Sequence, residues 1–262
     1  MTAVLLHVSD LHVGSGPALG EETLAGLRAV VGAHGPDLIV ASGDLTHRNL
    51  VKQHEEAARF LRALELPIVA VPGNHDIPAL PPGRFTRTFE AFESVWGEAE
   101  PTYRSDELVV AGLASVRPWL YQEGVVKADQ LERLERLFDE HPAAARVVVA
   151  HHHLASAPWR TAKRPLARRS NLLRALAELD VNLVVGGHVH QTSVASATEF
   201  YADAAHGVVA STTAGLGRPR PSRHNEVRGC QIWKIELAEL RSLTYGWIGG
   251  ELRQLAARTF PR

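Results

Sequence analysis

Seven side chains of the types that bind metal ions follow five short apolar runs of the sequence. They are Asp10, His12, Asp44, Asn74, His151, His188 and His190. Two of the five groups have i, i+2 spacing, which places both side chains on the same side of an extended segment. Ligands that follow different strands can meet where the carboxyl ends of those strands and their loops converge. The sequence therefore predicts one metal-binding site built from all five segments.

The chemistry of these ligands narrows the metal and the number of ions. Imidazole, carboxylate and amide groups without a thiolate suit Mn, Fe, Zn, Co or Ni. Seven ligands are too many for one ion with an open position, but they suffice for two ions if one carboxylate bridges them. Asp44 stands alone on its loop and is the candidate bridge. Two ions roughly 3.5–4 Å apart can hold a hydroxide between them and clamp a phosphoryl group.

Short runs rich in Val, Leu and Ile precede these segments, and amphipathic helical patterns lie between them. The expected strands are Ala3–Val8, Asp37–Ala41, Pro67–Val71, Leu108–Leu113, Val147–Ala150 and Val181–Val185. The expected helices are Glu21–Ala33, Lys52–Leu64, Ala128–Phe138 and Ser170–Leu179. Strands that are apolar on both faces indicate a sheet covered on both sides, and the alternation of strands and helices indicates an α/β fold.

The C-terminal part, residues 205–262, has a different pattern. Strands are expected at Gly207–Thr213, Gln231–Leu237 and Leu243–Ile248, followed by a final helix near Leu252–Ala257. No long helix separates these strands, which favours antiparallel additions or a second sheet. Because neither an internal repeat nor a clean linker is evident, residues 1–262 are expected to form a single domain.

Five motifs, in order along the chain, resemble the signature blocks of the calcineurin-like metallophosphoesterases. They are Asp10-Leu11-His12, Gly43-Asp44, Gly73-Asn74-His75-Asp76, the strand-end His151 and Gly187-His188-Val189-His190. The resemblance implies a four-layer α/β/β/α sandwich and a dinuclear centre of Mn or Fe ions, with Zn, Co or Ni as other options. It also implies two ligand sets that share one residue. Asp10, His12, Asp44 and His190 would hold one ion, and Asp44, Asn74, His151 and His188 would hold the other.

The same resemblance implies a reaction. A metal-bridging hydroxide would attack phosphorus, and His75, which serves no ion, would assist the leaving group. The motifs around Asp44 and Asn74 are most similar to the bacterial class III cyclic-nucleotide phosphodiesterases, so a cyclic nucleotide is the expected substrate. The alternative is a broad-specificity phosphodiesterase or phosphomonoesterase acting on other small phosphoesters. A non-catalytic scaffold is a distant third, because such proteins usually lose a ligand or the equivalent of His75.

Three features leave alternatives open. Any member of the histidine run His151–His153 can take the ligand position, depending on where the preceding strand ends, although the register favours the first. Asp76 either orients the imidazole of His75 or caps a turn. The basic loops Arg160–Arg169 and Arg218–Arg223 either contact the substrate or are solvated surface.

Composition argues against several other functions. The net charge is −1, from 28 Lys and Arg against 29 Asp and Glu, which argues against a long nucleic acid as partner. The single cysteine, Cys230, permits no intrachain disulfide. Neither an export signal nor an apolar run of membrane length is present, so a cytoplasmic protein without membrane contact is expected. A homodimer is compatible with the C-terminal strands.

Overall fold

Two six-stranded sheets lie face to face in the computed structural model, which describes residues 2–16, 19–154, 163–199, 207–217 and 227–262. The first sheet has the order β12 (Glu251–Pro261), β11 (Glu239–Ile248), β10 (Gly229–Glu236), β1 (Thr2–Val8), β2 (Leu38–Ala41) and β3 (Ile68–Ala70). The second has the order β4 (Thr102–Arg104), β5 (Leu108–Leu113), β6 (Ala145–Ala150), β7 (Leu183–Gly186), β9 (Val209–Thr212) and β8 (Ser193–Ser196).

The central strands of each sheet are parallel. β1, β2 and β3 run side by side in one direction, and so do β5, β6, β7 and β9. The strands added at the edges are antiparallel, because β10 pairs with β1 and β4 pairs with β5 in that sense. Within each sheet the parallel strands end at the same edge, so the segments that follow β1, β2 and β3 lie together, as do those that follow β6 and β7. The two groups meet where His151, after β6, donates to the carbonyl of Ser42, after β2.

Alternate residues of the buried strands enter different hydrophobic cores, as the period of a strand requires. In β1, Leu5 joins the core between the sheets, whereas Leu6 joins an outer core. That outer core also contains Leu27 of helix α1 (Glu21–His34) and Leu61 of helix α2 (Val51–Arg62). The strands are apolar on both faces because each face packs against another layer.

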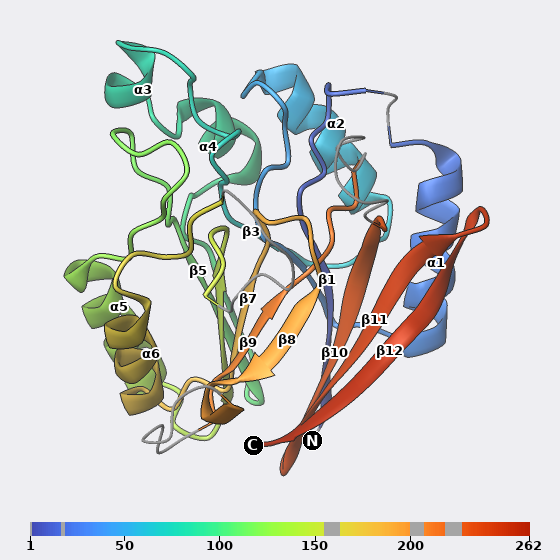
Figure 1. Ribbon diagram of the computed structural model, residues 1–262, viewed down its shortest axis with the longest axis vertical. Helices are drawn as coiled ribbons and strands as arrows, with labels where there is room; N and C mark the ends of the chain where they lie inside the picture. The colour runs from blue at the N-terminus through green and yellow to red at the C-terminus, as the bar shows by residue number, and fades with distance from the viewer. Residues whose placement is uncertain (1, 17–18, 155–162, 200–206, 218–226) are drawn as a thin grey trace.

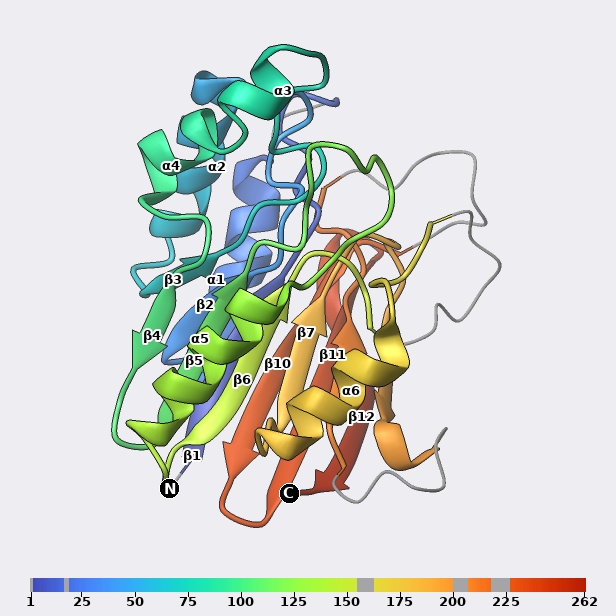
Figure 2. The same cartoon turned by 90° about the vertical axis from the view of Figure 1, so that its left-hand side faces the viewer.

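A third core covers the opposite face of the second sheet. Val148 of β6 packs there with Leu134 of helix α5 (Ala128–Asp139) and Leu176 of helix α6 (Arg169–Glu178). Figure 1 shows α5 and α6 on one outside, α1 and α2 on the other, and the two sheets between them, and Figure 2 shows the same layers from the side. The predicted four-layer α/β/β/α sandwich is confirmed.

The four predicted helices correspond to α1, α2, α5 and α6. Two short helices were not expected, α3 (Gly83–Thr86) and α4 (Glu90–Trp96), which follow the third metal-ligand motif, together with the 3₁₀ turn Ala197–Glu199. Within the described parts of the chain, no helix is long and apolar enough to cross a membrane.

The predicted final helix near Leu252–Ala257 is wrong, because these residues lie in β12. Strand β12 pairs with β11 through a two-residue turn, Gly249-Gly250, with Ile248 opposite Glu251. Both glycines have positive φ, +60° and +91°, which a tight hairpin turn of this kind requires. The spacing of Leu252 and Leu255 is compatible with a helix, but pairing with the long neighbouring strand β11 overrides such a weak local preference.

Candidate metal centre

The seven candidate ligands lie in the segments that follow β1, β2, β3, β6 and β7. Five of the seven have positive φ angles although none is glycine: 51° at Asp10, 46° at His12, 51° at Asp44, 71° at His188 and 58° at His190. Such left-handed conformations are costly for ordinary residues and concentrate at functional sites, where the surrounding structure enforces them. The fold therefore holds these five residues in strained backbone conformations that direct their side chains into the site.

Four ligand atoms form a first cluster. His12 Nε2 and His190 Nε2 are 3.1 Å apart, and His190 Nε2 is 3.1 Å from Asp10 Oδ1. His12 Nε2 is also 3.7 Å from Asp10 Oδ1 and 3.7 Å from Asp44 Oδ2. Two imidazole nitrogens and two carboxylate oxygens thus face one small volume.

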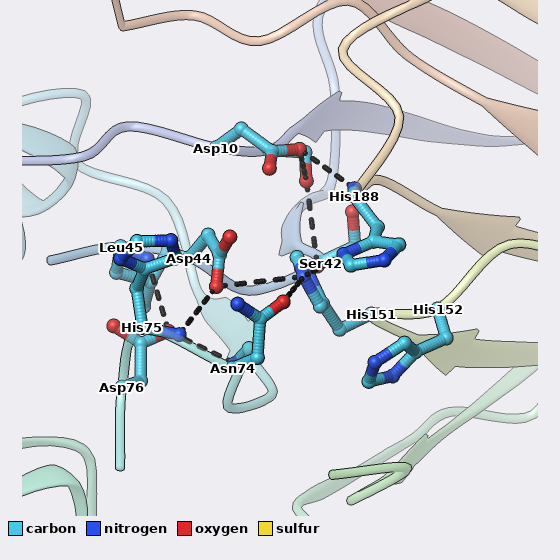
Figure 3. A network of polar contacts seen from close by, with 12 residues as sticks. Asp10, Ser42, Asp44, Leu45, Asn74, His75, Asp76, His151, His152 and His188 are labelled. Atoms are coloured by element: carbon cyan, nitrogen blue, oxygen red, sulfur yellow. Dashed lines mark hydrogen bonds and ion pairs between the residues drawn. The ribbon is translucent and has the colours of Figure 1, made fainter. Parts of the chain in front are cut away.

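A second cluster is centred on His151 Nε2 (Figure 3). This nitrogen is 3.4 Å from Asp44 Oδ1, 3.3 Å from Asn74 Oδ1 and 3.2 Å from His188 Nδ1. Asp44 therefore directs Oδ2 to the first cluster and Oδ1 to the second. This is the arrangement that a bridging carboxylate needs.

Both clusters fit a metal ion. Donor atoms that lie about 2.1 Å from one ion are roughly 3–3.4 Å from each other, close to the spacings in the two clusters. In the described part of the chain, Asp10 Oδ1 and Asp44 Oδ2 have no hydrogen-bond partner, although the residues are only 1 % and 0 % exposed. A buried carboxylate oxygen without a partner is costly, and a bound cation removes that cost.

Groups outside the clusters fix the direction of the ligands. His151 Nδ1 donates to the carbonyl of Ser42 at 2.8 Å, and His188 Nε2 donates to the carbonyl of Gln122 at 3.1 Å. Since a carbonyl only accepts, these bonds leave His151 Nε2 and His188 Nδ1 available for an ion. Asp10 Oδ2 accepts from Ser9 Oγ at 2.7 Å and from the His188 amide at 3.0 Å. These bonds turn its Oδ1 toward the first cluster.

Charges in the site set the protonation of the ligands. Burial raises the pKa of Asp44, but the charge and hydrogen bond of His151, together with the charges of His12 and His75, hold that pKa well below its usual range. Burial lowers the pKa of His188 well below 6.5, and His152 and Lys163 add to this effect. Asp44 is thus ionised and His188 neutral, which are the forms that bind metal. Burial also lowers the pKa of His151, but Asp44 outweighs it and raises the value to about 9.

Two glycines allow the loops to approach each other this closely. A Cβ on Gly73 would overlap the backbone nitrogen and Oδ1 of Asp44, and a Cβ on Gly187 would overlap Ser9 Oγ and Asp10 Oδ2. Any larger residue at either position would displace a candidate ligand.

Of the three consecutive histidines, His151 is the one whose ring nitrogen lies in the second cluster. The ring of His152 instead contacts Ser115, with Nδ1 at 2.9 Å from Ser115 Oγ. The ring of His153 stacks against His188 at a centroid distance of 6.0 Å. Strand β6 ends at Ala150, so His151 is the first residue after the strand.

His75 lies beside the clusters without belonging to the seven. Its amide donates to Asp44 Oδ1 at 2.8 Å, and its ring Nδ1 donates to the carbonyl of His47 at 3.0 Å. The ring lies edge-to-face with His12, with centroids 4.9 Å apart, and it is partly exposed. A partly exposed imidazole beside the two clusters is in a position to contact a bound molecule.

Asp76 binds the backbone of two ligand loops, and none of its described contacts is with the His75 ring. Its two oxygens accept from Leu45 N at 3.0 Å, Thr46 N at 2.8 Å, Thr46 Oγ1 at 2.8 Å and Gly73 N at 2.9 Å. Of the two roles considered for Asp76, the structure supports that of a turn-capping carboxylate, which here joins the loop after β2 to the loop after β3.

Sequence reasoning missed two contributors to the site. The carbonyl of Gln122 carries no side-chain signal, so nothing in the sequence points to it. His47 belongs to none of the five motifs, but its ring stacks on His75 with centroids 5.6 Å apart. Its position three residues after Asp44 was a usable signal. The loop residues Arg160 and Arg218–Arg223 lie outside the described residues.

Comparison with known proteins identifies the family. Residues 3–192, which contain all five ligand segments, match the calcineurin-like phosphoesterases. The chain belongs to this family. Its members depend on a dinuclear metal centre, and the two clusters supply His and Asp ligands suited to one. The chain is a metal-dependent phosphoester hydrolase.

Two known proteins are similar to this chain in sequence. A probable cyclic nucleotide phosphodiesterase of Synechococcus is 25 % identical over 205 residues, covering 74 % of this chain and 76 % of the relative. The 3′,5′-cyclic adenosine monophosphate phosphodiesterase CpdA of Escherichia coli is 27 % identical over 198 residues, covering 71 % and 69 %.

Solved structures agree on the fold. A purple acid phosphatase from yellow lupin matches all of this chain with a TM-score of 0.73 at 12 % identity, and the match spans 54 % of the lupin chain. A dimetal phosphatase from Danio rerio matches 96 % of this chain and 98 % of its own, with a TM-score of 0.68 at 11 % identity. At such low identity these matches establish the fold alone.

Proposed function

We propose that this chain is a phosphodiesterase that hydrolyses cyclic nucleotides at a two-metal centre. The proposed ligands are Asp10, His12, Asp44, Asn74, His151, His188 and His190. The observation that carries the proposal is the placement of Asp44, whose Oδ2 faces the first cluster and whose Oδ1 faces the second. The descriptions of the Synechococcus and Escherichia coli relatives as cyclic-nucleotide phosphodiesterases support the substrate class.

The proposed ions are Mn or Fe, with Zn, Co or Ni as alternatives that the same donor set accepts. When bound, two such ions supply positive charge for the phosphoryl oxygens and lower the pKa of a water nucleophile. The chain itself holds the ligand atoms in place. Ser42 and Gln122 do this through their carbonyls, and Asp76 does it by joining two ligand loops.

His75 is the proposed proton donor to the leaving oxygen. Its Nδ1–H is engaged by the carbonyl of His47, so the proton for the leaving group must come from Nε2 of a doubly protonated ring. Because His75 is partly exposed and its amide is fixed to Asp44, the ring stays beside the clusters and remains accessible to a substrate.

The test combines metal analysis with a substrate panel. The purified protein is loaded with Mn or Fe and assayed with 3′,5′- and 2′,3′-cyclic nucleotides, bis(p-nitrophenyl) phosphate and p-nitrophenyl phosphate. We expect two ions per chain and the highest kcat/KM on a cyclic nucleotide. We expect Asp44→Asn to lose both metal and activity, while Asp106→Asn, an exposed control, keeps both.

The possible results distinguish the proposal from its alternatives. Full metal occupancy in Asp44→Asn would refute the bridging role. A panel in which monoesters or other small diesters are hydrolysed as well as cyclic nucleotides would establish the broad-specificity alternative. The expected homodimer stays a prediction. Strand β12 is the outer strand of its sheet, and light scattering against the chain mass of 28.5 kDa tests for a second copy.

A further inference from the structure

Exposed apolar side chains lie on two segments beside the second cluster. One segment follows the proposed ligand Asn74 and includes α3, and it exposes Leu80 and Phe85. The other is the loop after β5, which exposes Trp119 and Tyr121 by 59 % and 63 %. Figures 1 and 2 show this loop beside α3. A group of large apolar side chains that stays exposed at the edge of a site indicates a binding surface.

The ring of Tyr121 is held in place from one side. The guanidinium of Arg84 lies 4.5 Å from the ring centre, and such a contact between a cation and the face of an aromatic ring is attractive. The guanidinium is itself fixed, because it donates to the carbonyls of Pro78, Pro118 and Leu120 at 2.9, 2.6 and 2.8 Å. Since Tyr121 remains 63 % exposed, its ring presents a flat apolar surface whose orientation is set in advance.

The same ring lies close to the proposed metal ligands. Tyr121 directly precedes Gln122, whose carbonyl accepts from His188 Nε2 at 3.1 Å. On its other side, the carbonyl of Pro78 binds the same guanidinium and comes shortly after the ligand Asn74. Because consecutive Cα atoms are about 3.8 Å apart, the backbone of Tyr121 lies within about 10 Å of the His188 ring. A single small molecule can therefore contact the tyrosine and place a phosphoryl group at the second cluster.

We propose that Tyr121 binds the base of a nucleotide substrate by stacking on it. Every base has a π face, so an aromatic side chain can stack on any of them. A ring that is already oriented loses little conformational freedom when the base binds. In a nucleotide one sugar separates the base from the phosphoryl group, in keeping with the short separation of Tyr121 from the second cluster.

This inference rests on the proposed function and deepens it, since it assigns the part of the substrate that is not a phosphoester to a side chain of this chain. A small phosphoester without a flat group gains nothing from the tyrosine ring. Tyr121 would therefore favour nucleotides over other small phosphoesters, while the metal ligands and His75 act on the phosphoryl group that all of them share.

The test measures the binding of adenosine 5′-monophosphate and of inorganic phosphate to the metal-loaded protein by isothermal titration calorimetry. Both probes carry a phosphoryl group, and the nucleoside is the difference between them. Tyr121→Ala removes the ring, and Tyr121→Phe keeps it. Leu237→Ala is the matched control, because Leu237 is a large exposed apolar residue near the amino end of β1, whereas Asp10 follows the carboxyl end.

We expect the parent to bind adenosine 5′-monophosphate more tightly than phosphate. In Tyr121→Ala the Kd of the nucleotide should rise at least about tenfold, because the stacking of one base contributes on this order. The Kd of phosphate and the metal content should stay as in the parent. Tyr121→Phe and Leu237→Ala should both bind the nucleotide within about twofold of the parent.

Three results would overturn the inference. A nucleotide Kd in Tyr121→Ala within about twofold of the parent would mean that the ring does not contact the base and that this surface binds some other molecule. Equal weakening of nucleotide and phosphate would mean that the substitution displaces Gln122 and His188. Weakening in Tyr121→Phe as large as in Tyr121→Ala would assign the effect to the hydroxyl and not to stacking.

Failure of the proposed function would give a different result. The parent would then hydrolyse no phosphoester, but it would still bind adenosine 5′-monophosphate, and Tyr121→Ala would still weaken that binding. Turnover of the substrate panel and calorimetry on the same metal-loaded samples therefore separate the base contact of Tyr121 from the reaction.

Discussion

At the scale of single residues, His75 is the proposed proton donor to the leaving oxygen and is not a proposed metal ligand. We predict that His75→Ala lowers kcat by 10²–10⁴-fold and leaves two ions per chain, because a general acid contributes about that much and the ring is not a proposed ligand. Steady-state kinetics and elemental analysis of the same sample measure both quantities. His141→Ala is the control. Unchanged turnover with intact metal content would remove His75 from the mechanism.

Asp76 is the residue that joins the two loops carrying Asp44 and Asn74. Replacing it with Ala leaves the amides of Leu45 and Gly73 without their buried acceptor. We predict a loss of about 3 kcal/mol in the free energy of unfolding and a 10–100-fold weaker metal affinity, since hydrogen bonds to a buried charge and groups that orient ligands contribute on this order.

Urea unfolding in EDTA and competition with a metal indicator measure the two effects of Asp76→Ala separately. Asp106→Ala, at an exposed position, should change neither quantity. Normal metal affinity in Asp76→Ala would show that the ligand loops keep their geometry without this carboxylate.

The sequence located the candidate ligands far better than the groups that orient them. Asp10, His12 and Asp44 stand in tight motifs directly after apolar runs, so their convergence followed from strand direction alone. The partners of His151 and His188 are backbone carbonyls of Ser42 and Gln122, which any residue could provide. Such contacts depend on tertiary geometry and leave no trace in residue type.

At the scale of elements, Arg84 of α3 fastens one loop of the site to another. The side chain is 3 % exposed and donates to the carbonyls of Pro78, Pro118 and Leu120 at 2.9, 2.6 and 2.8 Å. Its guanidinium also lies 4.5 Å from the ring centre of Tyr121. Two residues beyond Leu120, the carbonyl of Gln122 orients His188.

We predict that Arg84→Ala loosens this loop and weakens the second ion site. Hydrogen exchange of residues 117–125 should become at least about tenfold faster, because a fixed fork of three charge-assisted bonds is lost. The second metal should bind more weakly while the first is little affected, as stepwise metal titration will measure. Arg87→Ala is the control, since that side chain is 67 % exposed. Unaltered exchange in the loop would show that other contacts hold it.

The elements themselves were predictable where a pattern was long. The six runs expected before residue 190 became β1, β2, β3, β5, β6 and β7, because each is apolar enough to lie between two layers. The short elements β4, β8, α3 and α4 contain too few residues for a periodic apolar pattern to be recognised in the sequence. Strand β12 was misread because seven of its eleven residues are polar or alanine and mostly exposed, so its pairing with β11 decides its form.

At the scale of the whole molecule, a series of buried hydrogen bonds crosses the core between the two sheets. His7 of β1 is 0 % exposed, with Nε2 at 2.9 Å from Ser42 Oγ and Nδ1 at 3.3 Å from Gln231 Oε1. Ser211 of β9, in the other sheet, donates to the same Gln231 oxygen at 2.8 Å. The backbone carbonyl of Ser42 in turn accepts a hydrogen bond from His151, so this series of hydrogen bonds links the packing of the sheets to the candidate site.

Burial lowers the pKa of His7 from 6.5 to about 4. In the unfolded chain the ring takes up a proton near pH 6.5, but in the fold it does so only near pH 4. Between these values the unfolded state binds more protons, so the contribution of neutral His7 to stability is complete above pH 6.5 and is lost as the pH falls toward 4. A depression of this size corresponds to about 3 kcal/mol at most.

Urea unfolding of the metal-free protein at several pH values between 7.5 and 4 tests this prediction, with EDTA present so that metal release does not contribute. His7→Asn has no titrating ring, so its free energy of unfolding should fall less steeply with pH than that of the parent, by about 3 kcal/mol over the full range. His141→Asn, outside the core between the sheets, should follow the parent curve. Parallel curves for His7→Asn and the parent would mean that the pKa of His7 is the same in the folded and the unfolded chain, so that the ring is protonated within the fold below about pH 6.5. The contact between the sheets would then have to accommodate a buried cation beside Ser42 and Gln231.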